Sequence, residues 1–164
     1  MDIKDFKISW LKNKLILSSL KEFIENLIQK KGQDIIAMLL FGSLAQDKAT
    51  FSADYRSDID LLIISKNLLK EIVPRKLYTA KLSKSLGCGI HQIWNTPEEI
   101  TKSIDTHRAF YMEIIKYGRI LYEQDNCLTN LKNKTETILR ERGIRELEHI
   151  WLWPQDSPGS EIEW

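Results

Sequence analysis

The first segment of the chain has the hydrophobic spacing of a helix. Between Ser9 and Lys31, apolar residues recur every three or four positions and so share one helical face: Ile16, Leu20, Phe23 and Leu27. Lys30 and Lys31 suit the negative end of a helix, and Gly32 suits its stop. The pattern predicts one long helix over residues 9–31.

Three apolar runs of strand length come next. Ile35–Phe41 is continuously apolar and is typical of a strand covered on both faces, with a buried helix as the alternative interpretation. Asp58–Ile64 and Ile90–Trp94 predict two further strands. Between these two strands we expect a helix interrupted by Pro74, with a shared face and a glycine stop: Tyr78, Leu82 and Leu86, then Gly87 and Gly89.

The second half of the chain is mostly helical in pattern. Thr96-Pro97-Glu98-Glu99 has the residues of a helix start, and two helical pieces run on to Tyr117, where Gly118 ends them. A short strand is expected over residues 119–122, and helices over 126–142 and 144–151. Strands separated by helices favour an α/β (α+β) layer fold with a C-terminal helical segment. We expect one domain over residues 1–150 and a tail over 151–164.

Composition narrows the classes of function. The 164 residues are 43% hydrophobic and 29% charged, as in an ordinary soluble globule, and the net charge is +1. That balance argues against a dedicated duplex-DNA binder, which carries a basic stripe. The sequence shows no signal peptide and no apolar run long enough to span a membrane. We therefore expect a cytoplasmic protein with no membrane partner.

Two acids open the second apolar run. Asp58 and Asp60 stand two positions apart on the predicted strand, so they face the same way with Cα atoms roughly 6–7 Å apart. Ionised carboxylates this close repel each other and resist burial, whereas a divalent cation between them reverses that cost. Oxygen ligands of this kind suit Mg²⁺ or Mn²⁺ bound together with substrate phosphates. The pair taken alone is also compatible with two surface acids at a solvated strand end.

A glycine and a serine close the first apolar run. Gly42 permits close approach of the backbone to a ligand, and Ser43 is a plausible N-cap of a short helix over residues 44–48. The N–H groups of such a helix start attract phosphate. Gly-Ser alone is also an ordinary turn. Together with Asp58 and Asp60, however, the Gly-Ser turn offers hydrogen-bond donors for phosphate beside metal ligands, as a metal–triphosphate site requires.

This order of elements resembles the signature of the DNA polymerase beta-like nucleotidyltransferase superfamily. The matching stretches are Leu40–Ala45 and Ser57–Ile63, supported by the glycine-stopped segment Tyr111–Tyr122. Within this superfamily, the small size of the chain resembles that of the minimal nucleotidyltransferase group. The resemblance covers about residues 20–123, and the stretch after Arg142 has no counterpart in it.

The resemblance implies a mixed sheet flanked by helices and a transferase reaction. A nucleoside monophosphate from ATP or another nucleoside triphosphate would pass to an acceptor hydroxyl while pyrophosphate leaves. Gly42 and Ser43 would hold the outer phosphates, and Asp58 and Asp60 would bind two Mg²⁺ (or Mn²⁺) ions. The acceptor would be a protein side chain, a small molecule or an RNA end.

Two departures from the family pattern stand out. Fourteen residues, 44–57, separate Ser43 from Asp58, which is more than the family usually has. The family also places a third aspartate on the next strand, where this chain reads Ile90-His91-Gln92-Ile93-Trp94. His91 aligns best with that position and Gln92 lies one register away. His91 can accept a proton or bind a metal, and a core or surface histidine is the plainer interpretation.

The missing aspartate leaves two classes of function open. One is an active metal-dependent nucleotidyltransferase. The other is a catalytically weakened binding module, such as an antitoxin-like partner of a HEPN-type protein, which small members of the superfamily accompany. A generic α/β domain that happens to carry two acids is a third reading. Homo-oligomerisation stays open, and so does a role for the tryptophan-rich end of the chain in packing or partner docking.

Overall fold

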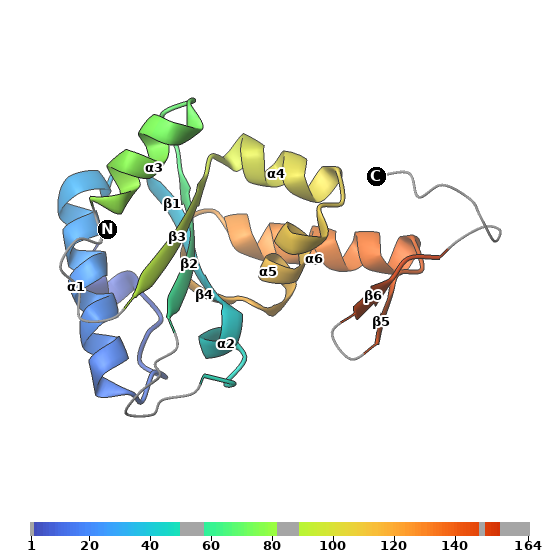
Figure 1. The fold of residues 1–164 in the computed structure, drawn as a ribbon, viewed down its shortest axis with the longest axis horizontal. Helices are drawn as coiled ribbons and strands as arrows, with labels where there is room; N and C mark the ends of the chain where they lie inside the picture. Colours follow the sequence, from blue (N-terminus) through green and yellow to red (C-terminus); the bar gives the residue numbers. More distant parts are fainter. Residues whose placement is uncertain (1, 50–57, 82–88, 148–149, 155–164) are drawn as a thin grey trace.

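A four-stranded mixed sheet forms the centre of the molecule. The computed structural model describes residues 2–49, 58–81, 89–147 and 150–154. Its main sheet has the strand order β3-β2-β1-β4, with bounds Ile90–Asn95, Ile59–Ser65, Ile35–Phe41 and Arg119–Glu123 (Figure 1). β1 is antiparallel to both β2 and β4, whereas β2 and β3 are parallel. The mixed α/β fold expected from the sequence is confirmed.

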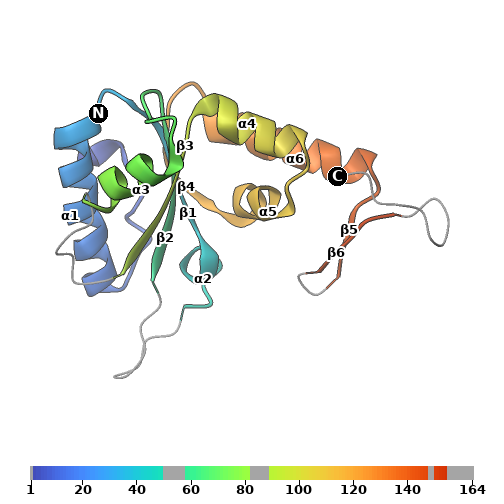
Figure 2. The same ribbon diagram turned by 45° about the horizontal axis from the view of Figure 1, so that its top comes forward.

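Helices cover both faces of this sheet and bury two separate cores. α1 (Lys14–Lys31) and α3 (Ile72–Ala80) lie on one side, and α4 (Pro97–Asp105), α5 (Ala109–Tyr117) and α6 (Cys127–Glu141) lie on the other (Figure 2). Because side chains alternate along a strand, β1 and β2 supply apolar residues to both layers. The core under α1 includes Leu20, Phe23, Met38 and Leu61, and the opposite core includes Leu39, Leu62, Ile104 and Met112.

The first helix is shorter than its periodicity predicted. It begins after Asn13, whose side-chain oxygen accepts hydrogen bonds from Leu15 N at 3.1 Å and Ile16 N at 3.2 Å. An asparagine cap satisfies N–H groups that have no partner inside the helix. The expected start at Ser9 is therefore wrong, and only a 3-10 turn, Ile3–Asp5, precedes α1.

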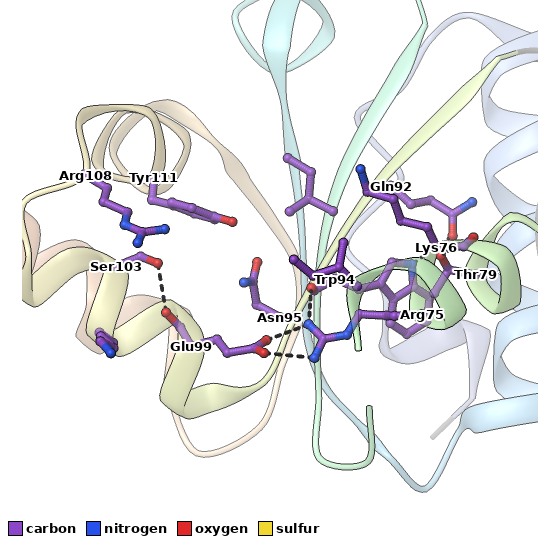
Figure 3. Close-up of a pocket in the computed structure, with 13 residues that line it drawn as sticks. Arg75, Lys76, Thr79, Gln92, Trp94, Asn95, Glu99, Ser103, Arg108 and Tyr111 are labelled. Carbon is purple, nitrogen blue, oxygen red and sulfur yellow. Dashed lines mark hydrogen bonds and ion pairs between the residues drawn. The ribbon is translucent and has the colours of Figure 1, made fainter. Parts of the chain in front are cut away.

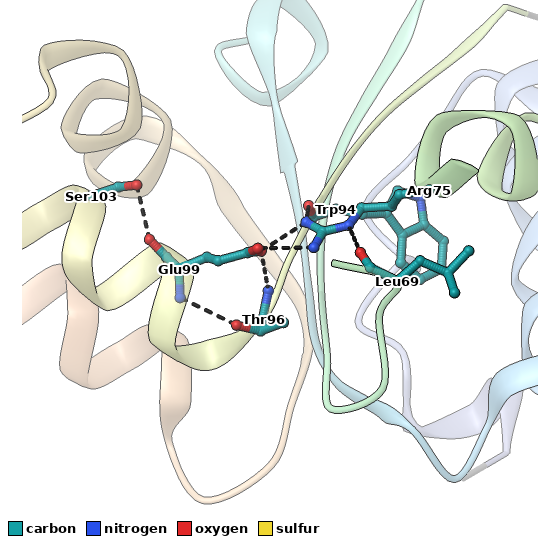
Figure 4. A network of polar contacts seen from close by, with 6 residues as sticks. All are labelled: Leu69, Arg75, Trp94, Thr96, Glu99 and Ser103. Carbon is teal, nitrogen blue, oxygen red and sulfur yellow. Dashed lines mark hydrogen bonds and ion pairs between the residues drawn. The ribbon is translucent and has the colours of Figure 1, made fainter. Parts of the chain in front are cut away.

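The start of α4 is built as the sequence indicated. The Thr96 side chain accepts from Glu99 N at 3.2 Å, and Thr96 N donates to the Glu99 carboxylate at 2.9 Å, which is a complete capping box. The same carboxylate receives a two-pronged ion pair from Arg75 of α3, at 2.8 and 2.9 Å (Figure 4). Glu99 thus joins α3 to α4 beside the edge strand β3.

Pro74 does not interrupt a helix. It stands in the first turn of α3, where its missing N–H removes no helical hydrogen bond. Tyr78 lies on α3, whereas Leu82, Leu86 and Gly87, expected on the same helix and at its stop, lie outside the described residues.

The helix expected over residues 144–151 is wrong. α6 ends at Glu141, Gly143 takes a left-handed conformation (φ 62°), and two short antiparallel strands follow, β5 (Arg145–Leu147) and β6 (Ile150–Leu152). Glu146 and Trp151 pair across the hairpin and both reach Lys116 of α5. This anchoring to α5 favours strands over the local helical pattern. β6 spans the expected boundary between the domain and the tail.

Within residues 2–49, 58–81, 89–147 and 150–154, no helix combines the length and apolar character that crossing a membrane would need.

Thr96→Ala should destabilise the fold by about 1 kcal/mol, because it deprives Glu99 N of its capping acceptor. For a chain of this size that corresponds to a fall in Tm of roughly 2–4 °C in a thermal melt. Thr101→Ala makes the same chemical change inside the same helix and should leave Tm within 1 °C or so. Equal losses in the two variants would contradict a capping role.

Candidate functional site

The register of β1 and β2 brings the glycine–serine turn against the second acid. Phe41, the last residue of β1, pairs with Asp60 of β2. Gly42 follows, and a Cβ built on it would lie 2.4 Å from Asp60 Oδ2. Only a residue without a side chain leaves room for that carboxylate. The glycine–serine turn and the acidic pair, which the sequence predicted to form one site, are therefore in contact through Gly42 and Asp60.

Asp58 lies one step before β2, exposed to solvent, and rests against a second glycine. A Cβ on Gly89 would lie 2.2 Å from Asp58 Oδ1, and Ile59 N donates to Gly89 O at 2.9 Å. Sequence reasoning treated Gly89 only as a helix stop. In the sequence, Gly89 could have been identified from its position immediately before β3, the strand that runs parallel to β2.

The parallel pairing of β2 and β3 separates His91 from Gln92. His91 pairs with Asp60, and its Nδ1 lies 3.6 Å from Asp60 Oδ1, with 82% of the histidine side chain exposed. Gln92 points to the opposite face, where its Oε1 accepts from Trp94 Nε1 at 3.0 Å. Of the two candidates for the position of the absent aspartate, His91 is the one beside the acids.

Asp60 carries an uncompensated charge. Partial burial is the main cause that raises its pKa above the ordinary aspartate value; His91 opposes this rise and Asp58 adds to it. Across the described residues, no lysine or arginine lies within ion-pair distance of Asp58 or Asp60. A carboxylate with 24% side-chain exposure and no strong cation beside it favours a cationic ligand.

The turn after β1 differs in detail from the expectation. α2 comprises Gly42–Ala45, its N-cap is Phe41, and Ser43 lies inside the helix, so the predicted cap at Ser43 and helix over 44–48 are wrong. Gly42 has φ 73°, which L side chains rarely adopt. The shift leaves the Ser43 hydroxyl without a hydrogen bond to any other described residue.

Arg119 of β4 fixes this turn, and sequence reasoning missed it. Its Nε donates to Ala45 O at 2.7 Å, its Nη2 pairs with Asp47, and its guanidinium stacks 4.3 Å from the Trp10 ring centroid. These contacts tie the far end of α2 to the sheet. Arg119 stands in the short strand that the sequence did predict, but its partners are 72 to 109 positions away.

The acids fit a metal–phosphate complex better than an all-protein metal cage. Within the described ranges, no group of three or more His, Cys, Asp or Glu side chains is arranged to hold an ion. Mg²⁺ commonly binds through one or two carboxylates and completes its shell with water and substrate phosphates. Asp58 and Asp60, with no competing basic side chain, meet that pattern.

Comparison with known proteins agrees with this geometry. Residues 22–127 match the family "Polymerase beta, Nucleotidyltransferase". A putative protein adenylyltransferase, MJ1305 of Methanocaldococcus jannaschii, is 30% identical over 131 residues, which cover 77% of this chain and 85% of the relative. The chain therefore belongs to the polymerase beta nucleotidyltransferase family, and its enzyme class is that of a nucleotidyltransferase.

Solved structures give weaker likenesses. A toxin–antitoxin with AMP-PNP aligns with TM-score 0.49 and 17% identity, covering 74% of this chain and 90% of that one. The toxin–antitoxin MntA-HpeT mutant D39ED41E aligns with TM-score 0.46 and 16% identity, covering 73% and 89%.

Gly42→Ala should destabilise the protein by about 1–2 kcal/mol, because alanine is strained at φ 73° and its methyl group meets Asp60. Chemical denaturation measures the loss. Gly89→Ala is the matched control: its methyl group meets only the exposed carboxylate of Asp58, which can rotate away, so its loss should be smaller. Equal losses would contradict the assigned role of the left-handed turn.

Asp60→Asn should stabilise the metal-free protein at neutral pH. A raised pKa means that the folded state binds this proton more tightly than the unfolded chain. Stability from that proton is present below the ordinary aspartate pKa and is lost as pH rises through the raised value. Asparagine removes the loss, so Tm at pH 7 in EDTA should rise by roughly 1–3 °C.

The same comparison at about pH 4 should show a smaller difference between Asp60→Asn and wild type, because the raised pKa leaves more of the carboxyl protonated there than at pH 7. Asp125→Asn serves as the control, since Asp125 is an exposed acid in a left-handed conformation that asparagine tolerates. A fall in Tm for Asp60→Asn at pH 7 would show that the carboxylate is structural.

Proposed function

We propose that this chain transfers a nucleoside monophosphate from ATP, or another nucleoside triphosphate, to a hydroxyl on a protein acceptor. One observation carries the proposal: strand pairing aligns Phe41, Asp60 and His91 across three neighbouring strands, with Gly42 next in line. The carboxylate of Asp60, the imidazole of His91 and the backbone turn at Gly42 thus lie together at one end of the sheet. Family membership and the name of the M. jannaschii relative support transfer and a protein acceptor.

Each residue has a role in this reaction. Asp58 and Asp60 would hold the divalent metal, Mg²⁺ or Mn²⁺, which would neutralise charge on the phosphates and favour loss of the acceptor's hydroxyl proton. The backbone of Gly42 and the hydroxyl of Ser43 hold the outer phosphates. The half-buried setting of Asp60 strengthens these interactions, because a lower local dielectric screens them less.

His91 replaces the third acid as proton acceptor. Its Nδ1 faces Asp60, which leaves Nε2 on an exposed ring for the acceptor. The acceptor oxygen forms a bond to the α-phosphorus, the bond from that phosphorus to the α,β-bridging oxygen breaks, and pyrophosphate leaves with the bond electrons. The hydroxyl proton passes to His91 Nε2. An imidazole suits this task near neutral pH.

A second candidate function is a binding module in which the same site is catalytically weakened. The observation that favours it is the described part of β3, which presents His91 and no carboxylate to Asp60. In that case the chain would bind nucleotide and act by occupying a partner, for example a HEPN-type protein. Asp58→Asn would then leave the partner function intact.

The decisive experiment follows labelled ATP. Incubation of the protein and Mg²⁺ with a cell extract and α-labelled ATP should label a protein band that the extract alone does not label, whereas γ-labelled ATP should give no band that depends on the added protein. Asp58→Asn/Asp60→Asn should reduce labelling by at least a hundredfold, and His91→Ala by about 10²-fold or more, in the range for a lost general base. Asp125→Asn should label like wild type.

Calorimetry separates the two candidates. MgATP binding that is lost in Asp58→Asn/Asp60→Asn, with no α-label transferred to any protein, would support the binding module. No MgATP binding by wild type would remove both.

A further inference from the structure

A cavity lies beside the outer edge of the sheet. It has a volume of about 430 Å³, within the range of small-molecule pockets, and opens where α3, β3, α4 and the start of α5 meet (Figure 3). None of the residues that line it is Gly42, Ser43, Asp58, Asp60 or His91. The cavity is therefore distinct from the site of the proposed reaction.

The lining carries an excess of positive charge. Glu99, the one carboxylate among the described residues of the lining, is held by Arg75, and hydrogen bonding to that guanidinium is the main cause that lowers the pKa of Glu99. The charges of Arg75 and Glu99 therefore neutralise each other. Lys76, Lys102 and Arg108 remain, none with an ion-pair partner in the described part of the chain. Three uncompensated cations around one cavity select an anionic ligand.

A buried amide in the same lining lacks a partner. Asn95 is only 7% exposed, and its Oδ1 makes no hydrogen bond within the described residues. Figure 3 shows its side chain directed into the cavity, between Glu99 and Tyr111. A buried polar atom without a partner destabilises a fold, so this oxygen favours a ligand that brings an N–H or O–H donor.

The neighbouring hydroxyls are already engaged. Thr79 donates to Lys76 O at 3.2 Å and Ser103 donates to Glu99 O at 2.9 Å. Ile93 and the ring of Tyr111 supply apolar surface to the same lining. The lining thus favours a ligand that combines an anionic group, a hydrogen-bond donor and a flat or apolar group.

We propose that this cavity binds a nucleoside monophosphate without a metal ion, with the phosphate at Lys102 and Arg108, a sugar hydroxyl or base amino group at Asn95, and the base against Tyr111. Inorganic phosphate fills only the charged part of such a site. The proposal rests on residues separate from those of the proposed reaction, so each can fail without the other.

The test is calorimetric titration of the full chain with AMP in EDTA. Wild type should bind AMP, and Lys102→Gln/Arg108→Gln should weaken binding at least tenfold. Lys14→Gln/Lys21→Gln removes the same charge from exposed positions of α1, across the sheet, and should change the affinity less than twofold. Asp58→Asn/Asp60→Asn should also bind AMP within twofold of wild type.

Asn95→Leu gives a readout that a purely structural role would not produce. It should weaken AMP binding at least fivefold and raise Tm without ligand, because it removes the unpaired oxygen from a buried position. If Asn95 instead supports the fold, Tm should fall.

Three results would overturn the proposal. The first is no AMP binding by wild type. The second is inorganic phosphate binding as tightly as AMP, which would show a simple anion site. The third is loss of AMP binding in Asp58→Asn/Asp60→Asn but not in Lys102→Gln/Arg108→Gln, which would place AMP at the acidic site.

Discussion

The contact between the Asp60 carboxylate and the bare backbone of Gly42 is the constraint on which the site depends. It exists only because β1 and β2 pair in the register that sets Phe41 opposite Asp60. Both strands are buried on two faces, and a slip of one residue would exchange the side chains that they present to the two cores. The packing of the two cores therefore fixes the position of the acid together with that of the sheet. The cost is a half-buried carboxylate with a raised pKa, and the proposed metal ion would reduce that cost.

The sequence predicted the parts of this arrangement that depend on local pattern. The central strands and the capped start of α4 were found because apolar runs and capping residues act over a few positions. What the sequence left open was the choice between His91 and Gln92, since that depends on how β3 pairs with β2. Gly89 and Arg119 were missed for the same reason. Their partners, Asp58 and Ala45, lie far away along the chain, and no local pattern records such contacts.

In each wrong prediction, hydrophobic spacing was outweighed either by tertiary contacts or by an effect at a helix end. Residues 144–151 have a helical spacing, yet a hairpin forms because Glu146 and Trp151, paired across it, both contact Lys116 of α5. At the other end, periodicity extended the first helix back to Ser9, whereas the Asn13 cap sets its start. Pro74 was read as a break because its place in the first turn depends on where α3 begins. In each case tertiary contacts or end effects outweighed spacing.

β3 connects the two sites through their opposite electrostatics. Its first residues place His91 beside Asp60, and its last residue, Asn95, faces the basic cavity. His91 and Asn95 stand four positions apart on the strand, about 13 Å at the usual rise. Two neighbouring carboxylates repel a phosphate that arrives without a metal, whereas Lys102 and Arg108 attract it. A metal would reverse the preference at the acids, because a cation held by the two carboxylates can bind phosphate. Under the two proposals, one edge strand would thus direct a metal–triphosphate and a metal-free monophosphate to different ends by charge.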